Sequence, residues 1–136
     1  MISVGIDVSK EKSTVFAADE NGEVLMRVCE FEHTEAGMAE LIRRLKQLPE
    51  EPRVVVENTG YYHWPVVNSL LAADIFVCIV NSIVMSKFAK VQIRPGKTDR
   101  LDAMLICRFG LANWSNLVRC CPDEERRTLL RLYSRE

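Results

Sequence analysis

The first third of the chain alternates between hydrophobic and polar positions with a period of two. One face of the first segment carries Ile2, Val4, Ile6 and Val8, and the other carries Ser3, Gly5 and Asp7. Segments 13–18 and 24–31 also have strand character, and Asn21-Gly22 between them is the strongest short hairpin signal. Period two is the signature of a strand, so we predict that the chain opens as a three-stranded antiparallel meander.

After residue 33 the hydrophobic period changes to that of a helix. Thr34 can cap a helix that continues to Leu48, where Pro49 ends it. The predicted buried stripe of this helix consists of Met38, Leu41, Ile42 and Leu45. Segments 53–57 and 75–80 are short and apolar, as strands buried in a parallel sheet are. Helices are predicted over 64–72, 82–90 and about 99–111.

This order of elements decides the fold class. Three antiparallel strands followed by alternating helices and strands are typical of an α/β protein with a mixed sheet. The order βββαβαβα predicts a ribonuclease H-like fold, with a mixed five-stranded sheet and flanking helices. We expect the strand that carries Asp7 to lie between its hairpin partner and the strand that ends at Glu57. Element order alone does not name a function.

Four acidic residues lie where these predicted elements begin or end. Asp99 and Asp102 are three residues apart, so they share one helix face with Cβ atoms about 5–6 Å apart. Asp7 and Glu57 each come where a predicted strand ends. Carboxylates that close repel each other unless one is protonated or a cation lies between them. The order D…E…D-x-x-D therefore indicates a hard-metal site for phosphodiester chemistry.

Each acid also has a purely structural interpretation. Asp99 can cap its helix and Asp102 can face the helix dipole, whereas Asp7 and Glu57 can be ordinary strand ends. Capping alone does not explain why the two aspartates continue the apolar stripe of their own helix. That stripe consists of Leu105, Ile106 and Phe109.

The strand face that carries Asp7 is otherwise made of small residues. Ser3 and Gly5 leave room there for a ligand or for close approach of another backbone. If the first and fourth strands are neighbours, the first turn of a following helix can lie over both of their ends. We therefore expect Asp7, Glu57 and Asp102 to converge on one divalent ion, with Asp99 nearby.

Composition narrows the class of protein. The 136 residues are 48% hydrophobic and 27% charged, which is typical of one globular domain. No apolar run approaches the roughly 20 residues that span a bilayer, and no signal peptide is evident. We therefore expect a cytoplasmic protein without a membrane segment. The five cysteines lack C-x-x-C spacing and are expected to be reduced thiols used mainly in packing.

The charge is unevenly distributed along the chain. A net charge of −1 argues against a stand-alone nucleic-acid-binding protein, which normally has a basic surface. Between residues 86 and 100, however, a single acid accompanies five basic residues. These candidate nucleic-acid contacts are Lys87, Lys90, Arg94, Lys97 and Arg100. Such a segment is suited to a metal-dependent phosphate site, although taken alone it is also typical of a solvated helix face.

Two other groups of residues carry less weight. His33 and His63 have no partners at metal-ligand spacing and are expected on the surface or in hydrogen bonds. An aromatic cluster after Glu57 can stack on bases, but packing at a helix start explains it more simply. This cluster consists of Tyr61, Tyr62 and Trp64.

Three ordered motifs carry a resemblance to a known family. They are Gly5-Ile6-Asp7-Val8-Ser9-Lys10, then Glu57-Asn58-Thr59-Gly60-Tyr61-Tyr62 with Trp64-Pro65, and Lys97-Thr98-Asp99-Arg100-Leu101-Asp102-Ala103. They resemble the DEDD transposases of the insertion sequence one-ten family, which are RNA-bridged DNA recombinases. The resemblance covers essentially the whole chain. It corresponds to the family's N-terminal catalytic domain, which is similar to the Holliday-junction-resolvase branch of the ribonuclease H-like fold.

The resemblance implies roles for these residues. Asp7, Glu57, Asp99 and Asp102 become the catalytic ligands of Mg²⁺, with Mn²⁺ as a substitute, in DNA strand cleavage and transfer. DNA, a guide RNA in the full-length protein and a homo-oligomer are the implied partners. Residues 1–118 then form the catalytic domain, and 119–136 begin a helical linker toward a C-terminal domain. That domain carries the nucleophilic serine, so no serine of this chain is assigned that role.

Two other functions fit parts of the pattern. A phosphotransferase of the sugar-kinase and actin type opens with a similar Gly-Ile-Asp strand and hairpin. It needs glycine-rich phosphate loops and a duplicated second half, whereas this chain has six glycines and no repeat. A non-catalytic module for nucleic-acid binding or dimerisation can share the fold, and measured divalent-cation binding distinguishes it from a nuclease.

Overall fold

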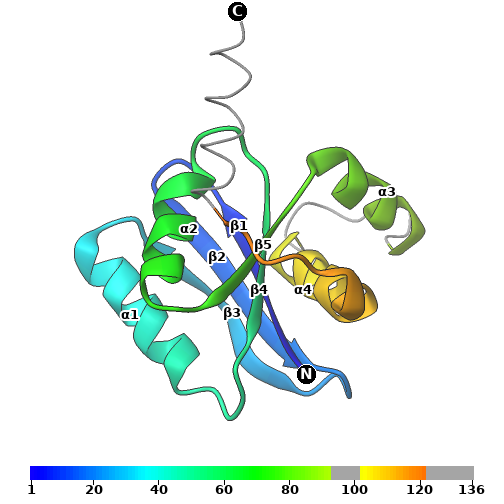
Figure 1. Ribbon diagram of the computed structural model, residues 1–136, viewed down its shortest axis with the longest axis horizontal. Helices are drawn as coiled ribbons and strands as arrows, with labels where there is room; N and C mark the ends of the chain where they lie inside the picture. The colour runs from blue at the N-terminus through cyan, green and yellow to red at the C-terminus, as the bar shows by residue number, and fades with distance from the viewer. Residues whose placement is uncertain (93–101, 122–136) are drawn as a thin grey trace, which may run out of the picture.

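The computed structural model describes residues 1–92 and 102–121. Its elements are β1 (Ile2–Val8), β2 (Lys12–Asp19), β3 (Val24–Glu32), α1 (Glu35–Lys46), β4 (Arg53–Glu57), α2 (His63–Ala72), β5 (Phe76–Val80), α3 (Ser82–Gln92), α4 (Asp102–Ala112) and the short 3₁₀ helix η2 (Trp114–Asn116). The strands form one five-stranded sheet in the order β3-β2-β1-β4-β5. Helices α1 and α2 cover one face of this sheet, and α3 and α4 lie on the other side (Figure 1).

The pairing of the strands makes the sheet mixed. β1 is antiparallel to β2 and parallel to β4, and β4 is parallel to β5. β1 therefore lies between its hairpin partner and the strand that ends at Glu57, as predicted from element order. The parallel register pairs Ile6 with Val56. Asp7 and Glu57 consequently follow at matching positions on neighbouring strands.

Local signals in the sequence explain where the early elements begin and end. The β2–β3 turn contains Gly22 at a φ of +81°, and the Asp19 carboxylate accepts the Asn21 and Glu23 N–H groups at 2.9 Å. The Thr34 hydroxyl accepts the Gly37 N–H at 3.0 Å, which caps α1 as predicted. The buried residues of α1 are Met38, Leu41 and Leu45, while Ile42 is partly buried against them.

The larger hydrophobic core lies between the sheet and helices α1 and α2. The even-numbered face of β1 points into it, and Val54 and Val56 of β4 continue the same layer. The helices contribute Leu41, Leu45, Val66, Val67 and Leu70, each almost fully buried. Full burial of such a side chain stabilises a fold by about 1.5–3 kcal/mol. This layer therefore supplies much of the driving force that holds β1 and β4 together.

On the opposite face, α4 packs against β1 unusually closely. A Cβ on Gly5 would overlap the Ala103 carbonyl oxygen and lie 3.1 Å from Cys107 Cα. The Ser3 hydroxyl donates to the Cys107 carbonyl at 2.8 Å, and the Cys107 thiol donates to the Ser3 carbonyl at 3.1 Å. The small residues of β1 thus accommodate a helix backbone rather than a ligand. Ser3 contacts the middle of α4 and Gly5 its first turns, so Asp7 faces the beginning of this helix.

The cysteines behave as packing residues. All five are reduced thiols; Cys78, Cys107 and Cys120 are buried, Cys29 is partly buried and Cys121 is exposed. Cys107 is part of the contact between α4 and the sheet. Across the described ranges, each helix is too short or too polar to cross a bilayer.

Candidate metal centre

Three of the predicted acidic residues come from three different elements at one end of the sheet. Asp7 is near the end of β1, Glu57 is the last residue of β4, and Asp102 is the first residue of α4. All three are half-buried. Neighbouring strands are about 4.8 Å apart, and matching positions of a parallel pair point to the same face. Asp7 and Glu57 are therefore presented side by side toward α4.

The electrostatics of Glu57 link it to the other two acidic residues. Burial raises the pKa of the Glu57 carboxyl above its ordinary value of 4.5, and the negative charges of Asp7 and Asp102 raise it further. Like charges disfavour ionisation only over short distances. The structure thus brings Asp7, Glu57 and Asp102 into one electrostatic cluster.

The chemistry of this cluster fits a hard divalent ion, because carboxylate oxygens are the ligands that Mg²⁺ and Mn²⁺ prefer. Within residues 1–92 and 102–121, no three His, Cys, Asp or Glu side chains are already placed to hold a metal ion. The fourth predicted ligand, Asp99, lies outside the described residues.

The loop after Glu57 is held by a compact set of hydrogen bonds. The Asn58 N–H donates to the Val80 carbonyl at 2.9 Å, and the Gly60 N–H donates to the Asn58 side chain at 2.9 Å. Gly60 has a φ of +90°, a conformation that favours glycine. The Thr59 hydroxyl accepts the His63 N–H at 3.0 Å, which closes the loop onto the start of α2. The backbone that follows Glu57 is therefore fixed.

His63 is buried rather than on the surface. Its side chain is 1% exposed, and its Nδ1 accepts the Thr59 N–H at 3.3 Å. Burial lowers the pKa of the imidazole, so the neutral ring is favoured. Among the described residues Nε2 has no hydrogen-bond partner. The prediction that His63 serves in hydrogen bonding is correct. Thr59, four residues before His63, is the residue in the sequence that could have indicated this hydrogen-bonding role.

Two of the five candidate basic contacts lie in the described part of the chain. Lys87 and Lys90 are exposed on α3, which begins two residues after Val80. Since Val80 is hydrogen-bonded to Asn58, α3 starts beside the loop that follows Glu57. The remaining candidates, Arg94, Lys97 and Arg100, lie outside the described residues.

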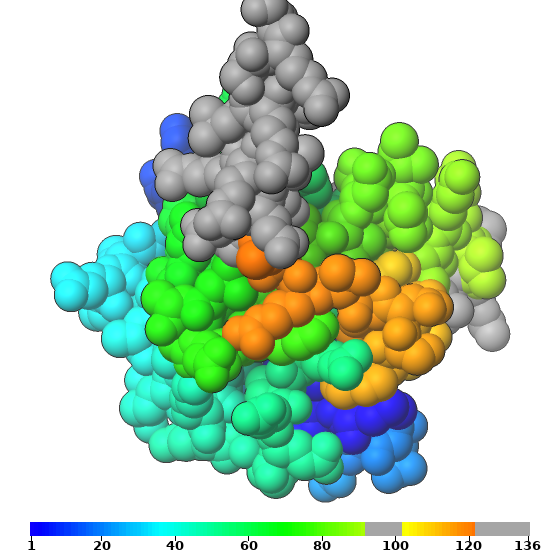
Figure 2. Space-filling view, viewed as in Figure 1, coloured from blue at the N-terminus to red at the C-terminus, as the bar shows by residue number. Residues whose placement is uncertain are grey.

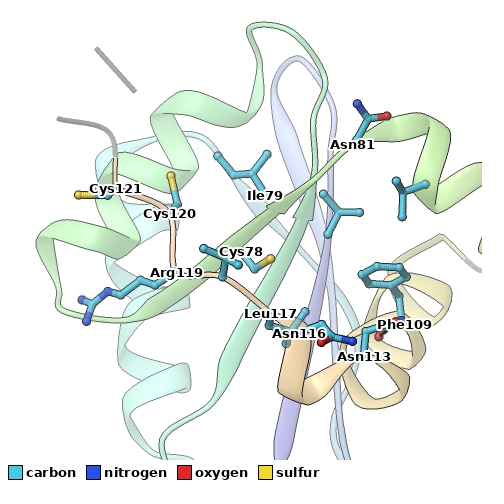
Figure 3. A pocket seen from close by; sticks show the side chains of 13 residues that line it. Cys78, Ile79, Asn81, Phe109, Asn113, Asn116, Leu117, Arg119, Cys120 and Cys121 are labelled. Carbon is cyan, nitrogen blue, oxygen red and sulfur yellow. Dashed lines mark hydrogen bonds between the residues drawn. The ribbon is translucent and has the colours of Figure 1, made fainter. Parts of the chain in front are cut away.

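Sequence reasoning did not point to a separate hollow of about 870 Å³ beside β5. It is lined by Cys78, Phe109 and the segment 117–121, among other residues (Figure 3). The Cys120 N–H donates to the Val77 carbonyl at 2.7 Å, so this segment runs along the edge strand. Figure 2 shows the segment in orange across the surface next to the green part of the chain. None of the described residues that line this hollow is acidic, so it is distinct from the carboxylate cluster.

Comparison with known proteins decides the family. Residues 4–136 match the model of the DEDD transposases of the IS110 type, described as a transposase. The chain belongs to this family. A search of curated proteins returns no match. The chain is also similar to two solved structures of RuvC from Thermus thermophilus, one of them in complex with a Holliday junction substrate.

These two structures support the fold. The RuvC complex is 12% identical with a TM-score of 0.61, and the match covers 88% of this chain and 99% of that one. The other RuvC structure is 11% identical with the same TM-score and coverage. The predicted ribonuclease H-like, resolvase-type fold and the predicted transposase family are confirmed. A transposase acts on DNA, so membership also implies DNA as a partner of this chain.

Proposed function

We propose that this chain is the catalytic domain of a DNA transposase in which Asp7, Glu57, Asp99 and Asp102 hold Mg²⁺, or Mn²⁺ in its place. Its reaction is divalent-metal-dependent DNA strand cleavage and transfer. The observation that carries the proposal is geometric: Asp7 and Glu57 follow at matching positions on the neighbouring parallel strands β1 and β4, and α4, which begins at Asp102, packs closely on β1. The negative charges of Asp7 and Asp102 act with burial to disfavour the ionised form of Glu57, and a cation bound among the three carboxylates would offset this effect.

Each described acid has a defined part in this proposal. Asp7 and Glu57 come from adjacent hydrogen-bonded strands, and this pairing fixes the backbone positions of both residues. Asp102 comes from α4, whose position on β1 is fixed by close backbone packing at Gly5. When bound, divalent ions stabilise the charge that develops on the phosphate oxygens of a phosphodiester. The three carboxylates orient such ions and, being half-buried, limit the water around them.

The proposal also covers the partners of the full-length protein. From the family resemblance, the proposal includes a guide RNA and a homo-oligomer. It also includes a division of the chain into a catalytic domain over residues 1–118 and the beginning of a helical linker over residues 119–136. The nucleophilic serine is assigned to a further domain. This chain supplies the metal-binding acids.

Cation binding at different pH values tests the metal site. Glu57 has a raised pKa in the folded state, so its own contribution to the stability of the folded protein without cation is fully present below about pH 4.5 and is lost as pH rises through that raised value. Near neutral pH, Mn²⁺ is therefore expected to bind and to raise the melting temperature. At about pH 5 both effects should weaken, because protons compete for Glu57. Titration calorimetry measures the Mn²⁺ affinity, and thermal melts measure the rise in melting temperature.

The matched control for this experiment is Glu57→Gln, which keeps the shape of the side chain and removes its titration. This variant should melt higher than the wild-type protein near neutral pH without cation, and it should bind Mn²⁺ weakly at every pH. Equal Mn²⁺ affinity of both proteins at both pH values would contradict the metal site.

The role of α3 in nucleic-acid binding is tested by Lys87→Gln combined with Lys90→Gln. Both ammonium groups are exposed, so the double variant should fold normally. DNA affinity is expected to fall, and the slope of log affinity against log salt should decrease by about 2, because each phosphate contact contributes about 0.9. Fluorescence anisotropy over a salt series measures the slope. Lys46→Gln, an exposed change on the opposite face of the sheet, should leave it unchanged.

A further inference from the structure

Tyr61 is the most exposed large hydrophobic side chain of the described residues. Its exposed fraction is 84%, and that of Tyr62 is 48%. Trp64, in contrast, is half-buried and packs on the His63 ring, with the ring centroids 4.8 Å apart. Packing at the start of α2 therefore explains Trp64 but leaves the Tyr61 ring without a role in the fold.

The exposure of this ring is imposed by an ordered backbone. Tyr61 follows Gly60, which has a φ of +90°, and the Tyr61 carbonyl accepts the Trp64 N–H at 3.3 Å. The Thr59–His63 contacts hold the two ends of the turn together. The backbone thus presents Tyr61 outward in a defined position, so binding through the ring costs little further backbone entropy.

The position of Tyr61 relates it to the acidic cluster. Tyr61 comes four positions after Glu57, so their Cα atoms are within about 14 Å even for an extended chain. This distance corresponds to about four base steps of 3.4 Å along a DNA strand. The exposed ammonium groups of Lys87 and Lys90 lie on α3, which starts beside the same loop.

The surroundings of the ring favour a nucleobase over a protein surface. The residues just before Tyr61 are exposed and small or polar, namely Asn58, Thr59 and Gly60. A protein-binding patch has a contiguous apolar centre, which this short turn lacks. A base has an apolar face for stacking and polar edges that suit the polar rim of the loop.

We propose that Tyr61 stacks on an unpaired nucleobase of the DNA strand that the acidic cluster acts on. The inference rests on the function proposed above and adds to it a contact with a base within about four steps of the reacting phosphate. Stacking on an aromatic ring is tolerant of sequence, because every base has a π-face. The contact therefore favours unpaired over paired DNA and does not select a sequence.

The test uses two DNA molecules of equal length, a fully paired duplex and a duplex with a short single-stranded flap that contains 2-aminopurine. Tyr61→Ala should weaken binding to the flap DNA about tenfold and leave binding to the paired duplex nearly unchanged. Tyr61→Phe, which keeps the ring, should bind like the wild-type protein. Quenching of 2-aminopurine fluorescence by the wild-type and Tyr61→Phe proteins, but not by Tyr61→Ala, would support stacking.

The outcomes separate this inference from the function on which it rests. If the wild-type protein binds Mn²⁺ and flap DNA and Tyr61→Ala binds both equally well, stacking is overturned and the proposed function stands. If the wild-type protein binds neither, both proposals fail. If Tyr61→Ala changes only self-association, measured by sedimentation, the ring is a contact between copies of the chain and stacking is overturned.

Discussion

Asp102→Asn is expected to remove divalent-cation binding and to reduce DNA strand cleavage by the full-length transposase about 10²–10³-fold or more. Asparagine keeps the shape of the side chain but removes one negative charge. Its neutral amide oxygen is a weaker ligand for a hard cation than a carboxylate. The substitution also removes one of the two charges that raise the pKa of Glu57, so the fold without cation should be unchanged or slightly more stable.

Cation affinity and cleavage have to be measured together on this variant. Asp74→Asn is a suitable control, because Asp74 is exposed and its ion pair with Arg119 lies on the surface. Asp74→Asn also removes one negative charge, but at a site outside the acidic cluster. Cation affinity and DNA cleavage should therefore both remain. Full cleavage by the Asp102→Asn protein would exclude the metal site. Cleavage would then belong to another part of the full-length protein, and a non-catalytic binding or dimerisation module would be the better interpretation of this domain.

The fold could be predicted from the sequence because its local signals agree with one another. The strict alternation of β1 and the Asn21-Gly22 turn define the meander, and the run Val54–Val56 marks a strand buried on both faces. A parallel pairing of the first and fourth strands then places Asp7 and Glu57 at matching positions. Strand pairing alone was therefore enough to bring two of the four candidate ligands together.

Contacts distant in sequence could not be predicted in the same way. Ser3 and Gly5 left two possibilities open, a ligand or a close backbone, and the choice depends on residues about 100 positions later in α4. The burial of His63 depends likewise on how α2 packs. Asp99 and three of the basic residues lie outside the described part of the chain, and the roles of all the candidate site residues stay predictions.

The close packing at Gly5 connects the fold to the proposed chemistry. Asp7 belongs to β1 and Asp102 to α4, so their separation depends on how closely the helix approaches the strand. Gly5 permits that approach, and the reciprocal hydrogen bonds between Ser3 and Cys107 fix the register of the two elements. A change at this contact should alter the acidic cluster without touching any acidic residue.

Gly5→Ala is therefore expected to destabilise the protein by about 3 kcal/mol, at the upper end of the usual cost of overpacking, because the added methyl group meets the rigid backbone of α4. Urea unfolding measures this loss. The helix must also shift away from β1, so Mn²⁺ affinity should fall about tenfold or more even where the variant is fully folded. Circular dichroism at the temperature of the titration establishes that it is folded.

Val4→Ala distinguishes a displaced helix from a general loss of stability. Val4 is fully buried on the same strand, but it faces α1 and α2 instead of α4. Removing its two methyl groups should cost about 2 kcal/mol through lost burial and a small cavity. Since α4 is not displaced, Mn²⁺ affinity at a temperature where the protein is folded should equal that of the wild type. If Gly5→Ala retained the same affinity, the distance between α4 and β1 would not govern the site, and the coupling proposed between packing and cation binding would be wrong.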